Sequence, residues 1–235
     1  MPENGKPEEP RALTRELLLS GDLPGLIAKF LPDMRLLSDA ERAASMHATL
    51  AERPEHGDGV WMFAYGSLIW NPTIHYTDRR LARAIGWHRS FCLNARAGRG
   101  TPANPGLMLG LKSGGTCVGA AFRIDEAVVE HELDLLWRRE MIGDGYVPRW
   151  VEIEGDDGTK IGGAIAFTIN PAGPSYCGDL PEAEVVRRLA TARGGLGTGA
   201  EYLFNTRDSL RELGINDPFV ERLAELVTIE LRPAP

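Results

Sequence analysis

The stretch VWMFAYGSLIW, residues 60–70, sets the fold class, because the character of the chain changes at Val60. Its first half is a short apolar run of the kind that forms a buried strand. Tyr65-Gly66-Ser67 then interrupts the run with residues typical of a tight loop. Glycine at a strand end lets the backbone approach a ligand closely, and amides of such a loop can face an anion or a developing oxyanion. Because a strand followed by Gly and Ser is more often a simple turn, this stretch alone does not establish a site.

Further strands are predicted after this stretch, in runs that are rich in β-branched and aromatic residues and are separated by Gly, Pro or Asn. The predicted strands cover residues 82–94, 106–112, 116–124, 148–154 and 162–169. Helices are predicted at about 126–142, 181–193, 200–213 and 217–227. Strands gathered in the middle, with helices at the ends and one inserted, predict an α+β fold with a small mixed β-barrel or a strongly twisted sheet.

The N-terminal part of the chain predicts helices over residues 12–30 and 38–52. Ser38, with Glu41 three residues later, forms a capping-box pattern at the start of the second helix. Residues 52–59 have the composition of a linker, and the first ten residues are expected to be disordered. We therefore predict a helical N-terminal extension over residues 1–59 and a separate main domain after it.

The composition limits the classes of partner and compartment. The chain has 235 residues, 43% of them hydrophobic and 25% charged, and a formal net charge of −7. This balance argues against nucleic acid and anionic lipid as partners. No run long enough to cross a membrane and no secretory leader is visible. The odd, widely spaced Cys92, Cys117 and Cys177 favour a reducing, cytoplasmic location, and the five histidines show no metal-binding spacing.

The predicted helix over residues 126–142 places Glu140 within an apolar face. The other members of this face are Val129, Leu133, Leu136, Trp137 and Met141. His131, Arg138 and Arg139 are expected to point elsewhere.

A carboxylate on a core-facing stripe costs several kcal/mol unless it is paired or takes up a proton. A carboxyl group with a raised pKa is what a general acid or base needs. The alternative interpretation is a structural ion pair with a nearby arginine, which the helix pattern alone favours. Gly143-Asp144-Gly145 follows the helix and would open its end to solvent.

Other candidate groups give weaker signals. Ser67 lacks a GxSxG context, and neither His75 nor His88 pairs with it locally, so a serine nucleophile is not favoured. The glycine-rich stretch 194–199 follows a predicted helix and lacks the lysine of a phosphate loop, so we predict a helix cap and turn. Arg99 is suited to meet a substrate carboxylate.

Several segments together resemble the ChaC-like γ-glutamylcyclotransferases. These segments are FAYGSLIWNP (63–72), WHRSFCL (87–93), RGTPANPGLMLGL (99–111), LLWRREMIGDGYVPRWV (135–151) and EYLFNT (201–206). The resemblance covers roughly residues 60–230, and the first 60 residues carry none of it. It implies a small mixed β-barrel flanked by helices, and a γ-glutamylcyclotransferase-like catalytic domain over residues 60–230.

The resemblance also implies a reaction and a set of site residues. Glutathione would be cleaved to 5-oxoproline and Cys-Gly by attack of its own α-amino group on its γ-glutamyl carbonyl, without metal or cofactor. Glu140 would be the acid/base. The substrate-binding residues would be Tyr65, Gly66, Ser67, Leu68, Ile69, Trp70, Tyr146 and Tyr202, with Arg99 as a further candidate.

The resemblance leaves several questions open. Gly143-Asp144-Gly145-Tyr146 and Thr198-Gly199-Ala200 depart from the turns usual in the family, which bears on substrate affinity and not on the reaction type. The same cyclisation on γ-glutamyl-amino acids or γ-glutamylamines, and a non-catalytic module that binds a γ-glutamyl ligand, are the alternatives. The sequence leaves open whether the protein is a monomer or a dimer.

Overall fold

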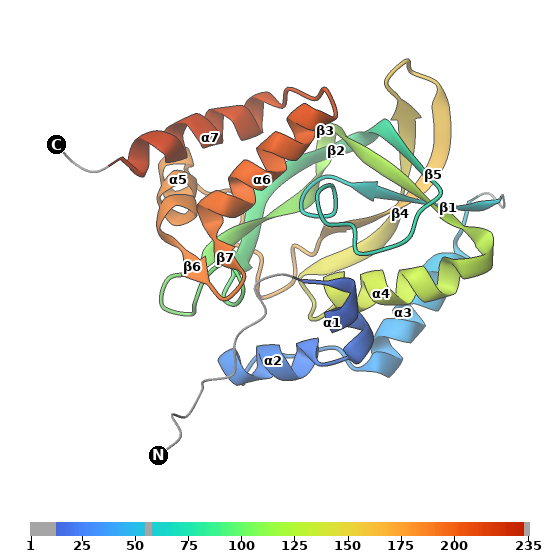
Figure 1. The fold of residues 1–235 in the computed structure, drawn as a ribbon, viewed down its shortest axis with the longest axis horizontal. Helices are drawn as coiled ribbons and strands as arrows, with labels where there is room; N and C mark the ends of the chain where they lie inside the picture. The colour runs from blue at the N-terminus through green and yellow to red at the C-terminus, as the bar shows by residue number, and fades with distance from the viewer. Residues whose placement is uncertain (1–12, 55–57, 233–235) are drawn as a thin grey trace.

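A closed, mixed β-barrel forms the centre of the protein (Figure 1). The computed structural model describes residues 13–54 and 58–232. The barrel strands are β1 (Gly59–Ala64), β2 (Asp78–Ala95), β3 (Gly106–Asp125), β4 (Tyr146–Gly155) and β5 (Lys160–Ile169). They close in the order β1-β3-β2-β4-β5, with β5 parallel to β1 and to β3 and the other pairs antiparallel. The predicted α+β class and the small mixed barrel are confirmed.

Strand β3 corrects one expectation, because the predicted strands 106–112 and 116–124 are a single strand. Gly114 and Gly115 between them have φ of 100° and 75°, which in the sequence looks like a turn. On the partner strand, Ile85 pairs with Thr116 while Trp87 pairs with Ser113, so two residues of β3 stand opposite one residue of β2. The glycines therefore form a bulge that bends the β2–β3 ribbon without ending it.

The N-terminal part contains α1 (Arg15–Ser20), α2 (Leu23–Phe30) and α3 (Asp39–Ala51). The single helix predicted over residues 12–30 is wrong, because Gly21 adopts a left-handed conformation with φ 75° and ends α1. The predicted capping box of Ser38 and Glu41 is confirmed at the start of α3. The prediction of disorder for the first ten residues lies outside the described residues.

The remaining helices lie close to their predicted positions. They are α4 (Val129–Glu140), preceded by a 3₁₀ turn (Glu126–Val128), then α5 (Glu182–Thr191), α6 (Gly199–Glu212) and α7 (Pro218–Glu230). The glycine-rich stretch before α6 forms a two-stranded turn, β6 (Arg193–Gly194) and β7 (Gly197–Thr198). Thr198 then caps α6 together with Glu201, so the predicted turn and cap are confirmed. No helix among the described residues is long and apolar enough to cross a membrane.

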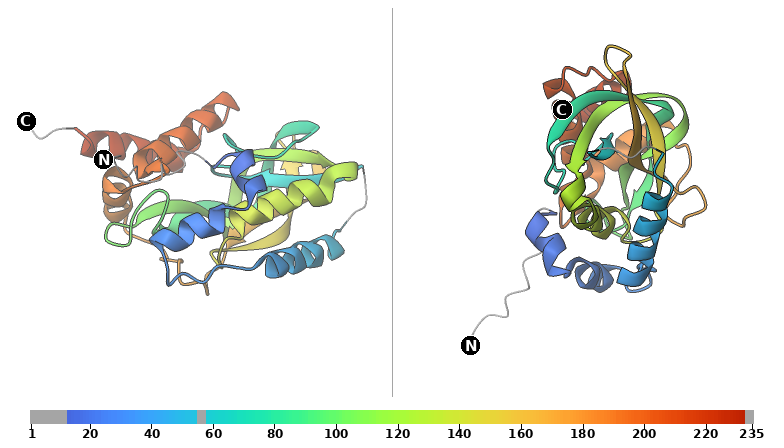
Figure 2. Two further views of the ribbon diagram at one scale, coloured as in Figure 1. Left: turned by 60° about the horizontal axis from the view of Figure 1, so that its bottom comes forward. Right: turned by 90° about the vertical axis from the view of Figure 1, so that its right-hand side faces the viewer.

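Helix α4 lies between the barrel and the N-terminal helices, while α5, α6 and α7 gather at the other end of the barrel (Figures 1 and 2). Leu133, Leu136 and Trp137 face the barrel core and are fully buried, as the predicted apolar face requires. On the opposite side, Leu135 packs with Leu18 and Leu23 of the N-terminal helices. Each buried leucine stabilises this sandwich by roughly 1.5–3 kcal/mol, so the C-terminal end of α4 is held in place from both sides.

Candidate active site

Glu140 is the last residue of α4, and its side chain is only 12% exposed. Its apolar neighbours on the helix, Trp137 and Met141, are buried in the core. Oε1 of Glu140 lies 2.8 Å from Nε of Arg139. Burial raises the pKa of Glu140, and the charge and hydrogen bond of Arg139 lower it without cancelling the effect. The pKa of this carboxyl group is therefore above its ordinary value, which is the direction that a general acid or base requires.

Arg139 corrects the sequence interpretation, which placed it away from the apolar face. Its side chain is 3% exposed. A helical wheel gives the direction of the Cα–Cβ bond, whereas a long guanidinium side chain can run along apolar surface to partners outside the helix. Arg139 donates to Ser67 Oγ at 3.1 Å, to Thr73 Oγ1 at 3.3 Å and to the carbonyl of Asn71. The ion pair expected for a structural glutamate is therefore present, and the same arginine joins Glu140 to the loop after β1.

The turn after β1 carries the predicted Tyr-Gly-Ser-Leu residues. It is closed by hydrogen bonds from Ile69 N to Gly66 O and from Asn71 N to Ser67 O, both 2.9 Å. Within residues 13–54 and 58–232, the backbone amides of Ser67 and Leu68 donate no hydrogen bond. A Cβ atom on Gly66 would lie 3.1 Å from Oη of Tyr202, so glycine permits a close approach to that tyrosine.

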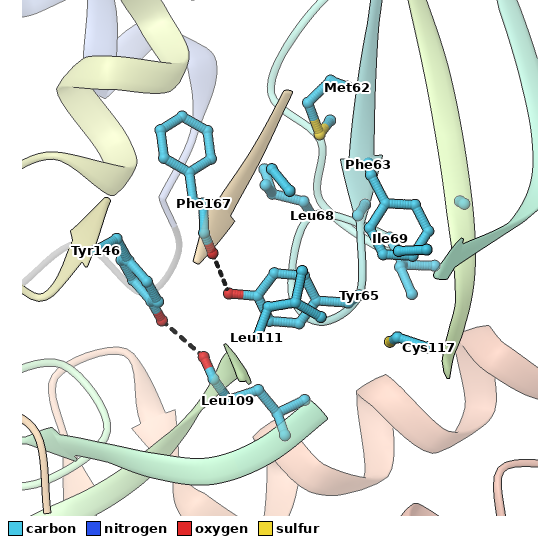
Figure 3. Packing of buried hydrophobic residues seen from close by; sticks show 14 of the residues in the cluster. Met62, Phe63, Tyr65, Leu68, Ile69, Leu109, Leu111, Cys117, Tyr146 and Phe167 are labelled. Atoms are coloured by element: carbon cyan, nitrogen blue, oxygen red, sulfur yellow. Dashed lines mark hydrogen bonds between the residues drawn. The ribbon is translucent and has the colours of Figure 1, made fainter. Parts of the chain in front are cut away.

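Three tyrosines of the site are buried: Tyr65 at the start of the turn, Tyr146 and Tyr202. The Tyr65 hydroxyl donates to Phe167 O at 2.6 Å, and the Tyr146 hydroxyl donates to Leu109 O at 2.8 Å (Figure 3). Burial raises the pKa of both phenols, and the neighbouring Glu140 raises it further. Both hydroxyl protons are thus held by backbone carbonyls, and a substrate contact of these tyrosines stays a prediction.

Tyr202, on α6, differs from the other two tyrosines. Its oxygen accepts a long hydrogen bond of 3.5 Å from Leu109 N, and no described residue accepts its hydroxyl proton. Burial raises the pKa of Tyr202 to about 12, so this phenol is a neutral hydrogen-bond donor at neutral pH. Its ring makes an edge contact with Trp70, with centroids 6.4 Å apart. The indole Nε1 of Trp70 is buried and has no partner among the described residues.

The other predicted contact residues lie around this group. Leu68 and Ile69 are buried in the core cluster. Arg99 belongs to the loop between β2 and β3 and contacts the start of α6. Its Nη1 donates to Thr198 O at 3.2 Å and is 3.4 Å from Glu201 Oε2. Burial lowers the pKa of Arg99, and Glu201 and Tyr202 partly offset the effect. The structure therefore brings Glu140 and the turn together through Arg139, with Tyr202 against the turn and Arg99 near Tyr202.

The geometry does not form a serine–histidine pair. Ser67 Oγ has Arg139 as its partner, His75 is 77% exposed beside Glu132, and Nδ1 of His88 bonds Gly114 O. No group of described residues could hold a metal ion through three or more His, Cys, Asp or Glu side chains.

A cavity of about 470 Å³ lies away from Glu140, between the β2–β3 ribbon and the start of α7. The two terminal nitrogens of its lining residue Arg89 donate to Asp217 and to the carbonyl of Val118. We place the candidate site at Glu140, because that is where a buried carboxylate lies beside a turn with unpaired amides.

Comparison with known proteins gives the family. A family model for ChaC-like proteins matches residues 60–230. This chain belongs to the ChaC-like family. The ChaC-like chain is 43% identical, over 87% of its own length and 87% of the relative's, to the glutathione-specific gamma-glutamylcyclotransferase of Escherichia coli K12. It is 33% identical to gamma-glutamylcyclotransferase 2-1 of Arabidopsis thaliana over 73% of this chain and 83% of that protein.

Among solved structures, the ChaC-like chain is similar to the yeast gamma-glutamyl cyclotransferase specific to glutathione. The TM-score is 0.68 at 22% identity, covering 75% of this chain and 98% of the yeast chain, which shows the shared fold. The alignment with the Escherichia coli relative also corrects the expectation that the first 60 residues carry no likeness. Residues 60–235 are about three quarters of the chain, so an alignment over 87% of it must extend into residues 1–59.

Proposed function

We propose that this ChaC-like protein is a glutathione-specific γ-glutamylcyclotransferase, a lyase that converts glutathione into 5-oxoproline and Cys-Gly in the cytoplasm. The names of the relatives support the substrate. The observation that carries the proposal is a nearly buried carboxylate with a raised pKa, joined by Arg139 to a turn in which the described residues accept no hydrogen bond from the amides of Ser67 and Leu68. Cys92, Cys117 and Cys177 are free, as suits a reducing compartment.

Glu140 is proposed to start the reaction as a general base. The α-amino group of glutathione is an ammonium at neutral pH and cannot attack until it loses a proton. A carboxylate within about 3 Å can accept that proton. Arg139 keeps Glu140 at a fixed position, and its charge favours the carboxylate form against the effect of burial on the pKa.

The free amine then attacks the γ-glutamyl carbonyl carbon and closes a five-membered ring. Because the reaction is intramolecular, holding the γ-glutamyl arm curled supplies up to about 7–11 kcal/mol in favourable systems. Attack places negative charge on the carbonyl oxygen. The unpaired amides of Ser67 and Leu68 are the proposed donors to that oxygen, and one such donor contributes roughly 3–4 kcal/mol.

Collapse of the intermediate breaks the bond between the γ-carbonyl carbon and the cysteine nitrogen. Glu140 returns its proton to that nitrogen, which leaves as the amine of Cys-Gly. The attacking nitrogen releases its remaining extra proton to solvent as the lactam forms, so the carboxylate of Glu140 is restored. Tyr202, with a hydroxyl proton that no described residue accepts, and the buried indole N–H of Trp70 are proposed to bind polar atoms of the substrate. Arg99 is proposed to meet a substrate carboxylate.

The test is incubation of the purified protein with glutathione, followed by mass detection of 5-oxoproline and Cys-Gly. We expect the two products in equal amounts, without added metal. γ-Glutamyl-alanine serves as a competing substrate, and faster turnover of it would move the substrate class to γ-glutamyl-amino acids. Calorimetric binding of glutathione without any product would instead identify a binding module and contradict the proposal.

A further inference from the structure

The segment from Asn71 to His75, which follows the Tyr-Gly-Ser-Leu turn, is held by two arginines from different parts of the chain. Arg15 of α1 donates to Thr73 O at 3.1 Å. Arg139 of α4 donates to the carbonyl of Asn71 and to Thr73 Oγ1. Thr73 is the one described non-glycine residue with positive φ, 59°, a conformation that persists only where surrounding contacts enforce it.

Arg15 reaches this segment together with Glu132 of α4. Its two terminal nitrogens donate to the two carboxylate oxygens of Glu132 at 2.6 and 2.7 Å, the bidentate geometry that fixes orientation as well as distance. The same carboxylate accepts from the backbone amide of His75 at 2.9 Å. The Glu132 side chain is 2% exposed. One buried carboxylate thus ties α1 and α4 to the end of the segment.

The other side of the segment leads directly to the candidate site. Arg139 contacts Asn71 and Thr73 with one terminal nitrogen and Ser67 Oγ with the other, while its Nε pairs with Glu140. A displacement of residues 71–75 would therefore move two acceptors of the guanidinium that positions Glu140. The Asn71 side chain also donates to Leu13 O at 2.8 Å, so the N-terminal segment contacts the loop at a second point.

We propose that Arg15 is a positioning residue for the reaction: its bidentate contact with Glu132 and its bond to Thr73 fix residues 71–75, and through Arg139 they fix Glu140 against the Tyr-Gly-Ser-Leu turn. This gives the N-terminal helical segment a part in catalysis that its distance along the chain from Glu140 does not suggest. The proposal rests on the proposed cyclotransferase function for its kinetic effect, but the geometry it describes is independent of the substrate.

The experiment compares Arg15→Ala, Arg15→Lys and Glu132→Gln with the wild-type chain. We expect Arg15→Ala to lower kcat/KM for glutathione about tenfold, mainly through kcat, because small misplacements of a catalytic group are costly. Arg15→Lys should recover part of the loss, since an ammonium keeps the charge but not the bidentate geometry. The double variant Arg15→Ala/Glu132→Gln should be no slower than the worse single variant, because both changes break one contact.

Arg35→Ala is the matched control, because Arg35 lies in the same N-terminal segment and pairs with Glu41 at 2.6 Å on the surface. It should leave kcat/KM unchanged. Each variant is assayed below its own melting transition, and Arg15→Lys carries the test if Arg15→Ala does not fold. Wild-type kcat/KM in a folded Arg15→Ala, or additive effects in the double variant, would overturn the proposal.

Hydrogen exchange without substrate separates this proposal from the proposed function. The His75 amide donates to Glu132, so it should exchange faster in Arg15→Ala and not in Arg35→Ala. If the wild type releases no 5-oxoproline, the proposed function fails, and this arm still decides whether Arg15 holds the loop. Unchanged exchange in Arg15→Ala would overturn the positioning role in either case.

Discussion

Helix α4 carries two nearly buried glutamates about two turns apart, and their pKa values are shifted in opposite directions. Glu132 accepts from both terminal nitrogens of Arg15 and from the His75 amide. Burial raises its pKa, but these donors outweigh burial and the pKa is lowered. Among the described residues Glu140 has a single ion-pair contact, to Arg139, and burial keeps its pKa raised. The comparison shows that donors to the charged form outweigh burial at Glu132, whereas burial outweighs the single donor at Glu140.

The largest expected effect comes from Glu140→Gln. The amide is nearly isosteric and its oxygen can still accept from Arg139, so the fold should be kept. We expect turnover of glutathione to fall about 10²- to 10⁴-fold, the range typical of a lost general base. The measurement is 5-oxoproline release at matched circular dichroism. Turnover within tenfold of wild type would show that Glu140 is not the general base and that it has a structural role, as Glu132 has.

Arg139→Met is expected to lower kcat/KM about 10²-fold, because Glu140 and the turn lose their common partner. Glu140 must be deprotonated to accept the ammonium proton, so activity falls as pH falls through its pKa. Since Arg139 lowers that pKa, its removal should move the acidic limb of the pH–rate profile to higher pH. The tyrosines around the site do not titrate there, because burial raises the pKa of Tyr65, Tyr146 and Tyr202.

The control for this prediction is Arg139→Lys. This variant should retain part of the activity, and the acidic limb of its pH–rate profile should shift less than that of Arg139→Met. A limb that stays in place, or moves to lower pH, would contradict the proposed coupling of Arg139 and Glu140.

Besides its effect on turnover through Arg15, Glu132→Gln should lower the stability of the fold. We expect the free energy of unfolding to fall by about 1–3 kcal/mol at neutral pH, because Arg15 loses its charged partner. The pKa of Glu132 is lowered in the folded protein, so its contribution is present above the unfolded pKa and is lost as pH falls through the folded pKa. Urea unfolding of both proteins at pH 7 and at about pH 3 should therefore show the difference shrinking. A constant difference would mean that the carboxylate charge is not its source.

The smallest expected effect is that of Trp70→Phe. The buried indole N–H lacks a partner, so its removal should leave stability unchanged or slightly raised. If that N–H binds the substrate, KM should rise about two- to fivefold with little change in kcat, as for a lost interaction common to ground and transition states. Steady-state kinetics measures the change in KM, and thermal melting measures the change in stability. An unchanged KM would leave Trp70 with packing against Tyr202 alone.

The predictions of strands, helices and caps succeeded where the residues that carry the sequence pattern lie within one short segment of the chain. Ser38 and Glu41 are three residues apart, and the apolar face of α4 lies within one helix, so their patterns needed no tertiary information. The two-strand prediction at residues 106–124 failed because positive-φ glycines serve both turns and bulges. Arg139 was placed wrongly because its acceptors lie on a loop far away in sequence.

By itself, the sequence determined that a carboxylate lies on the apolar face of a helix and that a glycine–serine turn follows the first barrel strand. Both are consequences of side-chain spacing along a short stretch of backbone. Only the tertiary structure decided that Arg139 joins these features, and that Arg15, 117 residues from Glu132, satisfies the other buried carboxylate of α4. Which charges meet in a low-dielectric interior depends on how distant segments pack, and that packing sets the pKa values on which the proposed chemistry depends.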